Sequence, residues 1–233
     1  AGGTDLMVNA NHKAEPAGIL DLWRLPDIGF IRVDDEAIAI GAGTTWHEVE
    51  RHPTIRTKLA PLALAAREIG ALQIQARATL GGNVGTSSPV GDSLPVLLAL
   101  DAELELASPR GRRTVPYATW CTGYRKTLLA PDELIVAARV PLPSPATRTT
   151  WRKVGTRRAQ SISKVMGAAA ITLDGGTVVS ARVALGAVAD RPMRIAAVED
   201  AVRGLPLTQA AEAARTALRL AIKPIDDIRS TAT

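Results

Sequence analysis

The sequence predicts an α+β protein in which a mixed α/β part precedes a smaller α+β part built from an antiparallel sheet and helices. Short apolar strands alternate with helical patterns over the first 140 residues or so. Three prolines then fall within Pro141-Leu142-Pro143-Ser144-Pro145, and a strand-turn-strand pattern with two helical patterns follows them. We therefore expect a domain boundary at these prolines, with one domain over residues 1–143 and a second over 147–233.

The first part contains several elements with clear local signals. Residues 37–42 read as an apolar strand, 45–51 as a short helix capped by Thr45, and 59–69 as an amphipathic helix. The further expected elements are the end of another strand at Val84, a helix after the Asp92-Ser93 cap, a hairpin over 103–116 and a strand over 132–140.

The second part predicts a hairpin followed by helices. Residues 167–173 and 177–188 read as strands joined by the turn Asp174-Gly175-Gly176. Helices are expected over 196–202 and 208–220, the second ending near Pro224.

Composition limits the class of protein. The 233 residues are 46% hydrophobic, which is enough for a sizeable core. No apolar run reaches the roughly 18 residues of a membrane span, and no basic segment leads into an apolar one at the start. We expect a cytoplasmic protein that does not bind a membrane.

Few side chains suit metal or nucleic-acid binding. The single Cys121 cannot hold an iron-sulfur cluster, which takes four thiolates, and the histidines at 12, 47 and 52 lack ligand spacing, so no metal site is expected. The net charge is +5, but basic residues cluster only at Arg110, Arg112 and Arg113 and at Arg152, Lys153, Arg157 and Arg158. With only four Trp, two Tyr and one Phe, we expect no nucleic-acid partner.

The segment from Thr79 to Asp92, TLGGNVGTSSPVGD, has the composition of an anion-binding loop. It holds four glycines and four Ser or Thr residues in fourteen positions. Glycines let a ligand approach the main chain, and hydroxyl and N–H groups can donate to phosphate. A plain surface loop remains the alternative at this point, because isolated glycine-rich matches are common.

Two further segments strengthen the ligand interpretation. The chain begins AGGTDL, a second Gly-Gly-Thr loop, and residues 123–134 read GYRKTLLAPDEL. In this order and spacing the three segments resemble the FAD-binding domain of the molybdenum hydroxylases, the xanthine dehydrogenase and aldehyde oxidase family, and GYRKTLLAPDEL looks most like the xanthine dehydrogenase branch. The resemblance covers nearly the whole chain. It implies a FAD domain of the vanillyl-alcohol-oxidase-like type that begins upstream of Ala1, followed by the family's C-terminal flavoprotein domain.

The resemblance also implies which positions bind FAD. For the pyrophosphate and ribityl chain they are Ala1, Gly2, Gly3, Thr4, Asp5, Leu6, Thr79, Gly82, Asn83, Thr86 and Asp92. Asp92 would repel a phosphate, so it is expected to accept from ribose or adenine donors or to cap the following helix. Ile69 and Ile135 match the apolar positions beside the ring, and both read equally well as core residues.

Lys153 is the candidate catalytic residue, since a cation near the flavin N1 and O2 edge favours the reduced anion. A solvated surface lysine is the alternative. The sequence departs from the family after this position, because Gln160-Ser161-Ile162-Ser163 stands where animal members carry acidic residues, which leaves the acceptor open between NAD and dioxygen.

The resemblance implies an electron-relay function. The molybdopterin and the 2Fe-2S clusters would lie on partner domains or subunits, and FAD would pass electrons to NAD or another acceptor. Two alternatives stay open: a stand-alone flavin-dependent oxidase or dehydrogenase, and a non-redox nucleotide-binding module.

Overall fold

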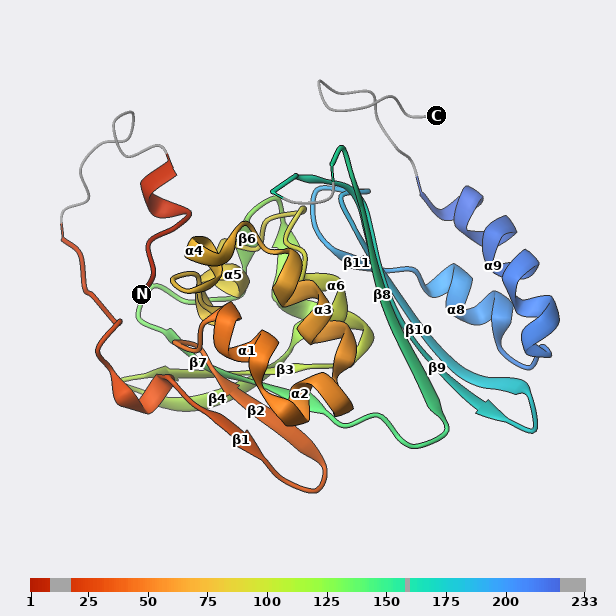
Figure 1. The fold of residues 1–233 in the computed structure, drawn as a ribbon, viewed down its shortest axis with the longest axis horizontal. Helices are drawn as coiled ribbons and strands as arrows, with labels where there is room; N and C mark the ends of the chain where they lie inside the picture. The colour runs from red at the N-terminus through yellow and green to blue at the C-terminus, as the bar shows by residue number, and fades with distance from the viewer. Residues whose placement is uncertain (9–17, 158–159, 223–233) are drawn as a thin grey trace.

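A five-stranded antiparallel sheet forms the base of the first part of the chain. The computed structural model describes residues 1–8, 18–157 and 160–222 (Figure 1). The sheet has the order β1-β2-β7-β3-β4, with bounds Ile31–Val33, Ala37–Gly41, Leu134–Pro141, Glu103–Ser108 and Gly111–Pro116. The central strand β7 pairs with β2, about a hundred residues earlier, and with β3, so the start and end of this part meet in one sheet.

Helices cover one face of this sheet and separate it from the second sheet (Figure 1). Their bounds are α1 Trp46–Arg51, α2 Pro53–Lys58, α3 Ala60–Glu68, α4 Leu72–Gln75, α5 Leu80–Thr86 and α6 Leu94–Ala99. Ile38 and Ile40 of β2 are fully buried with Trp46 and Leu62 from these helices in one core. The predicted cap of α1 is confirmed: the Glu48 amide donates to the Thr45 hydroxyl, and the Thr45 amide donates to the Glu48 carboxylate.

The second part is a four-stranded antiparallel sheet of order β11-β10-β9-β8, with bounds Met193–Arg194, Thr177–Gly186, Ser163–Asp174 and Thr147–Gly155. The predicted hairpin is confirmed as β9 and β10, whose turn uses Gly175 and Gly176 with φ of +53° and +85°. The two predicted helices, α8 (Ala196–Val202) and α9 (Leu207–Ala221), are confirmed and cover one face, while α3 and α6 lie against the other.

An ion-pair network joins the second part to the first. The Arg194 guanidinium donates to the carboxylates of Glu199 and Asp101, and Asp101 directly follows the last turn of α6. Arg182 on β10 also binds Asp101. These pairs tie β10 and β11 to the C-terminal end of α6.

Several local expectations were wrong. Val84 does not end a strand, because the glycine-rich segment forms helix α5 with Thr79 at its N-cap. Asp92 does not cap α6, whose N-cap Ser93 makes no side-chain cap bond. Strand β8 was not predicted, because its alternating Thr, Arg and Lys residues read as a polar basic stretch.

The sequence did not predict β1, α2, α4 or β11 either, nor the further short elements η2 Pro26–Ile28, α7 Tyr117–Trp120, β5 Cys121–Gly123 and β6 Lys126–Thr127. His12, Arg158 and the expected helix end near Pro224 lie outside the described residues.

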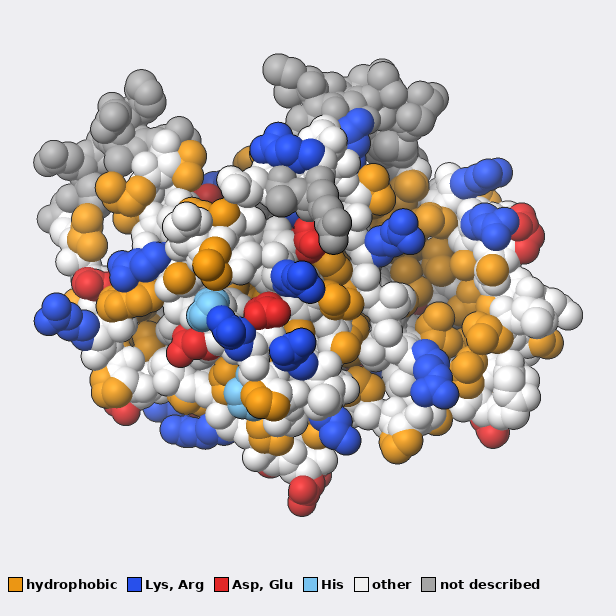
Figure 2. Space-filling view, viewed as in Figure 1, with side chains coloured by type: hydrophobic (Ala, Val, Ile, Leu, Met, Phe, Trp, Pro, Cys, Tyr) orange, Lys and Arg blue, Asp and Glu red, His pale blue; other side chains and the backbone are white. Residues whose placement is uncertain are grey.

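Charged side chains are dispersed over the face shown in Figure 2, where Lys and Arg lie among acidic and apolar side chains and do not merge into one patch. The basic cluster of the first part is internally paired, because Arg110, Arg112 and Arg113 bind Asp132, Glu105 and Glu133 respectively. In the part of the chain that the structure describes, no helix is both long and apolar enough to cross a bilayer.

Candidate functional site

A pocket of about 750 Å³ opens between the N-terminal segment, helix α5 and the start of β7. This volume lies within the usual range for ligand sites. Thirteen of the fourteen sequence-predicted positions line it: Ala1, Gly2, Gly3, Thr4, Asp5, Leu6, Ile69, Thr79, Gly82, Asn83, Thr86, Asp92 and Ile135. Lys153 is not in the lining, but its ammonium lies directly behind it on Asp92.

The N-terminal segment presents its backbone amides to the pocket. Among the described residues, the N–H groups of Gly2, Gly3, Thr4 and Asp5 have no protein acceptor. Gly3 has a φ of +73°, and successive amides around such a residue form a concave anion site. Gly2 lies so close to the main chain that an added Cβ would sit 1.8 Å from the carbonyl oxygen of Arg77. This approach requires glycine and holds the segment at the pocket wall.

Helix α5 contributes differently from the sequence expectation, since its first amides are already bonded within the protein. Leu80 N–H donates to Thr44 O at 3.0 Å, Gly81 N–H to Ala42 O at 2.8 Å, and Gly82 N–H to the Thr79 hydroxyl at 3.1 Å. An added Cβ on Gly81 would be 2.6 Å from the Ala42 side chain. This glycine therefore serves close packing of α5 against the end of β2, and the free donors for an anion lie in the N-terminal segment.

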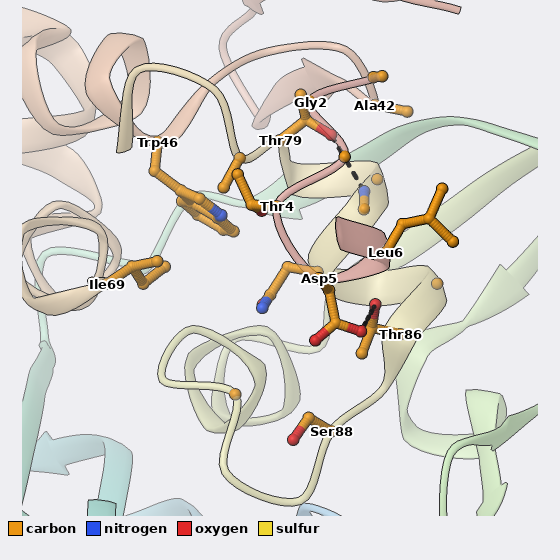
Figure 3. Close-up of a pocket in the computed structure, with 18 of the residues that line it drawn as sticks. Gly2, Thr4, Asp5, Leu6, Ala42, Trp46, Ile69, Thr79, Thr86 and Ser88 are labelled. Atoms are coloured by element: carbon orange, nitrogen blue, oxygen red, sulfur yellow. Dashed lines mark hydrogen bonds between the residues drawn. The ribbon is translucent and has the colours of Figure 1, made fainter. Parts of the chain in front are cut away.

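Asp5 joins the three segments that the sequence singled out. Its carboxylate accepts from the Thr86 hydroxyl at 3.4 Å, drawn in Figure 3, and pairs with Arg125 at the same distance. Thr86 ends α5 and Arg125 lies in the 123–134 segment. These contacts are long and exposed, so their role is to align the segments and their energy is small.

The Asp92 carboxylate is buried and fully engaged by the second sheet. Lys153 on β8 donates from Nζ to Oδ2 at 2.7 Å, and Ser163 on β9 donates to Oδ1 at 2.7 Å. The indole of Trp151 also donates to the Asp92 carbonyl at 3.0 Å. Burial raises the pKa of Asp92, while the bonds from Lys153 and Ser163 act in the opposite direction. Lys153 is therefore a buried partner of Asp92, and the solvated-surface alternative is wrong.

The turn before β7 is held by a residue that sequence reasoning did not single out. Glu133 accepts two bonds from Arg113, at 2.6 and 2.8 Å, and one from the Ala130 amide at 2.8 Å. The pKa of Glu133 is lowered to about 2, chiefly by the bonds from Arg113 and to a lesser extent by the bond from the Ala130 amide. This clamp places Leu129 and Ile135 on the pocket wall. The only sequence signal for this clamp is the presence of Glu133 within the segment APDEL.

Trp46 is a second residue that sequence reasoning missed, because a Trp at the start of an amphipathic helix reads as core. Its side chain is fully buried and lines the pocket. Figure 3 shows Trp46 and Ile69 on one side of the pocket, across from Leu6 and Thr86.

Comparisons with known proteins agree with this geometry. Residues 1–143 match the family described as the FAD binding domain in molybdopterin dehydrogenase, and residues 151–233 match the CO dehydrogenase flavoprotein C-terminal domain.

Relatives and solved structures support the same assignment. The nicotinate dehydrogenase FAD-subunit of Eubacterium barkeri is 32% identical over 89% of this chain and 72% of its own length. A putative xanthine dehydrogenase FAD-binding subunit of Escherichia coli is 34% identical with the same coverage. The structure of carbon monoxide dehydrogenase from Hydrogenophaga pseudoflava superposes with a TM-score of 0.94 at 32% identity, over 100% of this chain and 81% of that one. The chain therefore belongs to the family of FAD-binding subunits of the molybdenum hydroxylases.

Proposed function

We propose that this chain holds FAD in the 750 Å³ pocket and serves as the electron-transfer component of a xanthine dehydrogenase-like molybdenum hydroxylase. In this proposal residues 1–143 form the FAD domain and 147–233 the C-terminal domain. Iron-sulfur and molybdopterin subunits supply the electrons, and NAD accepts them. The carrying observation is that three segments far apart in sequence form one pocket with a row of free amides.

The residues present fit the groups of FAD. The amides of residues 2–5 are donors for the diphosphate, and they need no buried cation to neutralise it. Ile69 and Ile135 offer apolar walls for the ring, and Gly85 keeps the wall next to Ile135 open, since an added Cβ would lie 3.6 Å from its Cδ1. When bound, FAD supplies two-electron redox chemistry that amino-acid side chains lack.

The described lining residues are arranged for binding and electrostatics. They include no His, Tyr or Cys, and their carboxylates Asp5, Asp92 and Glu133 are each paired with a cation. A stand-alone oxidase needs an acid or base at the substrate. This observation supports the relay over that alternative. Lys153 would act on the ring's electrostatics through its pair with Asp92.

The xanthine dehydrogenase-like role rests on the GYRKTLLAPDEL segment and on the 34% identity to the Escherichia coli subunit. Relatives with other substrates are nearly as similar, so the substrate itself must be found by assay of the assembled enzyme.

The first experiment is a visible spectrum of the purified chain before and after FAD is added and the excess removed. We expect retained flavin bands that bleach with dithionite. A colourless chain would contradict FAD binding. The acceptor is tested by adding NAD to the anaerobically reduced chain: returning flavin bands support NAD, whereas recovery with dioxygen alone would contradict it.

A further inference from the structure

The indole N–H of Trp46 is a buried donor without an acceptor. Trp46 is fully buried, and Nε1 has no hydrogen-bond partner among the described residues. Nearly all buried polar groups in native proteins are paired, so an orphaned donor needs an explanation. The one other such atom in the described chain is Nδ1 of His52, which lies in a separate, smaller pocket.

The other three tryptophans of the chain have identified partners for their indole rings. The Trp120 indole donates to Val84 O at 3.1 Å, and the Trp151 indole donates to Asp92 O at 3.0 Å. Trp23 stacks its ring under the Arg77 guanidinium. Trp46 alone among the four has a buried indole N–H that meets no protein acceptor within the described residues.

The position of Trp46 is fixed from its backbone. Its amide donates to Ala78 O at 3.1 Å, and the preceding Thr45 pairs with Thr79 in an isolated β-bridge. In Figure 3 the indole nitrogen faces Thr4 and the interior of the pocket. The free amides of residues 2–5 lie on the same N-terminal segment as Thr4. The orphaned donor therefore belongs to the same pocket as the main-chain donors.

We propose that the Trp46 N–H donates a hydrogen bond to an oxygen of bound FAD. The inference rests on the proposed occupancy of this pocket by FAD. A flavin dinucleotide carries phosphate, ribose and ribityl oxygens, all of which accept hydrogen bonds. Trp46 is then a binding and positioning residue that completes the donor set of the N-terminal segment, and it takes no part in electron transfer.

The test compares two Trp→Phe variants of the flavin-free chain. Trp46→Phe keeps an aromatic ring but removes the donor, so FAD should bind about tenfold more weakly, a factor that corresponds to about 1.4 kcal/mol. Trp120→Phe is the matched control: it loses the same ring volume and also the hydrogen bond that the Trp120 indole makes to the Val84 carbonyl, which then keeps only its bond from the Ser87 hydroxyl. Without FAD, Trp46→Phe should therefore melt at a higher temperature than Trp120→Phe. Addition of FAD should raise the melting temperature of Trp46→Phe less than that of the wild type.

A rescue variant separates the donor from the ring. Trp46→His can place Nε2 where the indole Nε1 lies, because the two five-membered rings share their geometry, and it should bind FAD more tightly than Trp46→Phe. Equal FAD affinity in wild type and Trp46→Phe would overturn this inference and leave the proposed function standing. Absence of FAD binding to wild type would overturn both. If Trp46→Phe does not fold, a Trp46→His variant that binds more than tenfold more weakly than wild type overturns the inference.

Discussion

The Lys153 ammonium lies 2.7 Å from the Asp92 carboxylate, with both side chains only 9% exposed. Lys153 lies near the C-terminal end of β8 and Asp92 in the turn before α6, so this pair joins the second sheet to the wall of the pocket. Buried pairs of this kind do not necessarily add stability over apolar residues, but removing one partner is costly because it leaves a buried charge.

Replacing Lys153 with methionine should destabilise the chain by about 3 kcal/mol at pH 7. The pKa of Asp92 is already raised above 3.8 in the folded chain, and loss of the ammonium raises it further. When the pKa of a carboxyl is higher in the folded than in the unfolded state, the folded protein loses stability as the pH rises from the unfolded-state pKa to the folded-state pKa. The deficit should therefore shrink as the pH falls toward 4. Urea unfolding at pH 7 and pH 4 measures this, and an equal deficit at both values would contradict it.

Glu133→Gln should remove an acid-sensitive clamp. The folded-state pKa of about 2 lies below the ordinary 4.5, so the Arg113 pair stabilises the fold fully above pH 4.5 and loses this effect as the pH falls toward 2. The wild type should therefore exceed Glu133→Gln in stability at pH 7, and the two should converge near pH 2. Thermal melts across this range measure the difference. A gap that is constant with pH would show that Glu133 acts through packing alone.

Gly2→Ala should weaken FAD binding by at least about tenfold, or ~1.4 kcal/mol. The new methyl group would collide with the Arg77 carbonyl and displace the segment that carries the free amides. Unfolding stability should change little, because the side chains of residues 5–8 are exposed. Gly29→Ala is the control, since its added Cβ meets nothing within 4 Å. Titration with FAD measures both variants, and equal affinities would refute the role of this close approach.

Two glycines of α5 should respond oppositely to alanine. At Gly81 the added Cβ would meet the Ala42 side chain at 2.6 Å, so Gly81→Ala should cost about 1 to 3 kcal/mol through overpacking. At Gly85 the nearest atom is 3.6 Å away, so the higher helix propensity of alanine should make Gly85→Ala neutral or stabilising by up to about 1 kcal/mol. Chemical denaturation of both variants tests this, and a Gly81→Ala variant as stable as wild type would refute it.

Local signals in the sequence were sufficient for many elements. The Thr45 cap, the β9–β10 turn with its two glycines, and the helices α8 and α9 were all predicted, because each depends on residues close together in the chain. The family and its FAD followed from three short segments, whose residues also form the pocket.

Only the tertiary structure decided which partner each polar group at the pocket binds. The sequence by itself determined thirteen of the residues that line the pocket, through the family resemblance carried by the segments at 1–6, 79–92 and 123–134, but it did not indicate Trp46. It could not show that Asp92 meets Lys153 sixty-one residues later, that the amides of α5 are taken by Thr44 and Ala42, or that the Trp46 N–H is left without a partner. These hydrogen-bond partners depend on how separate sheets and helices pack together. The residues around a donor in the sequence do not show which distant acceptor will lie next to it.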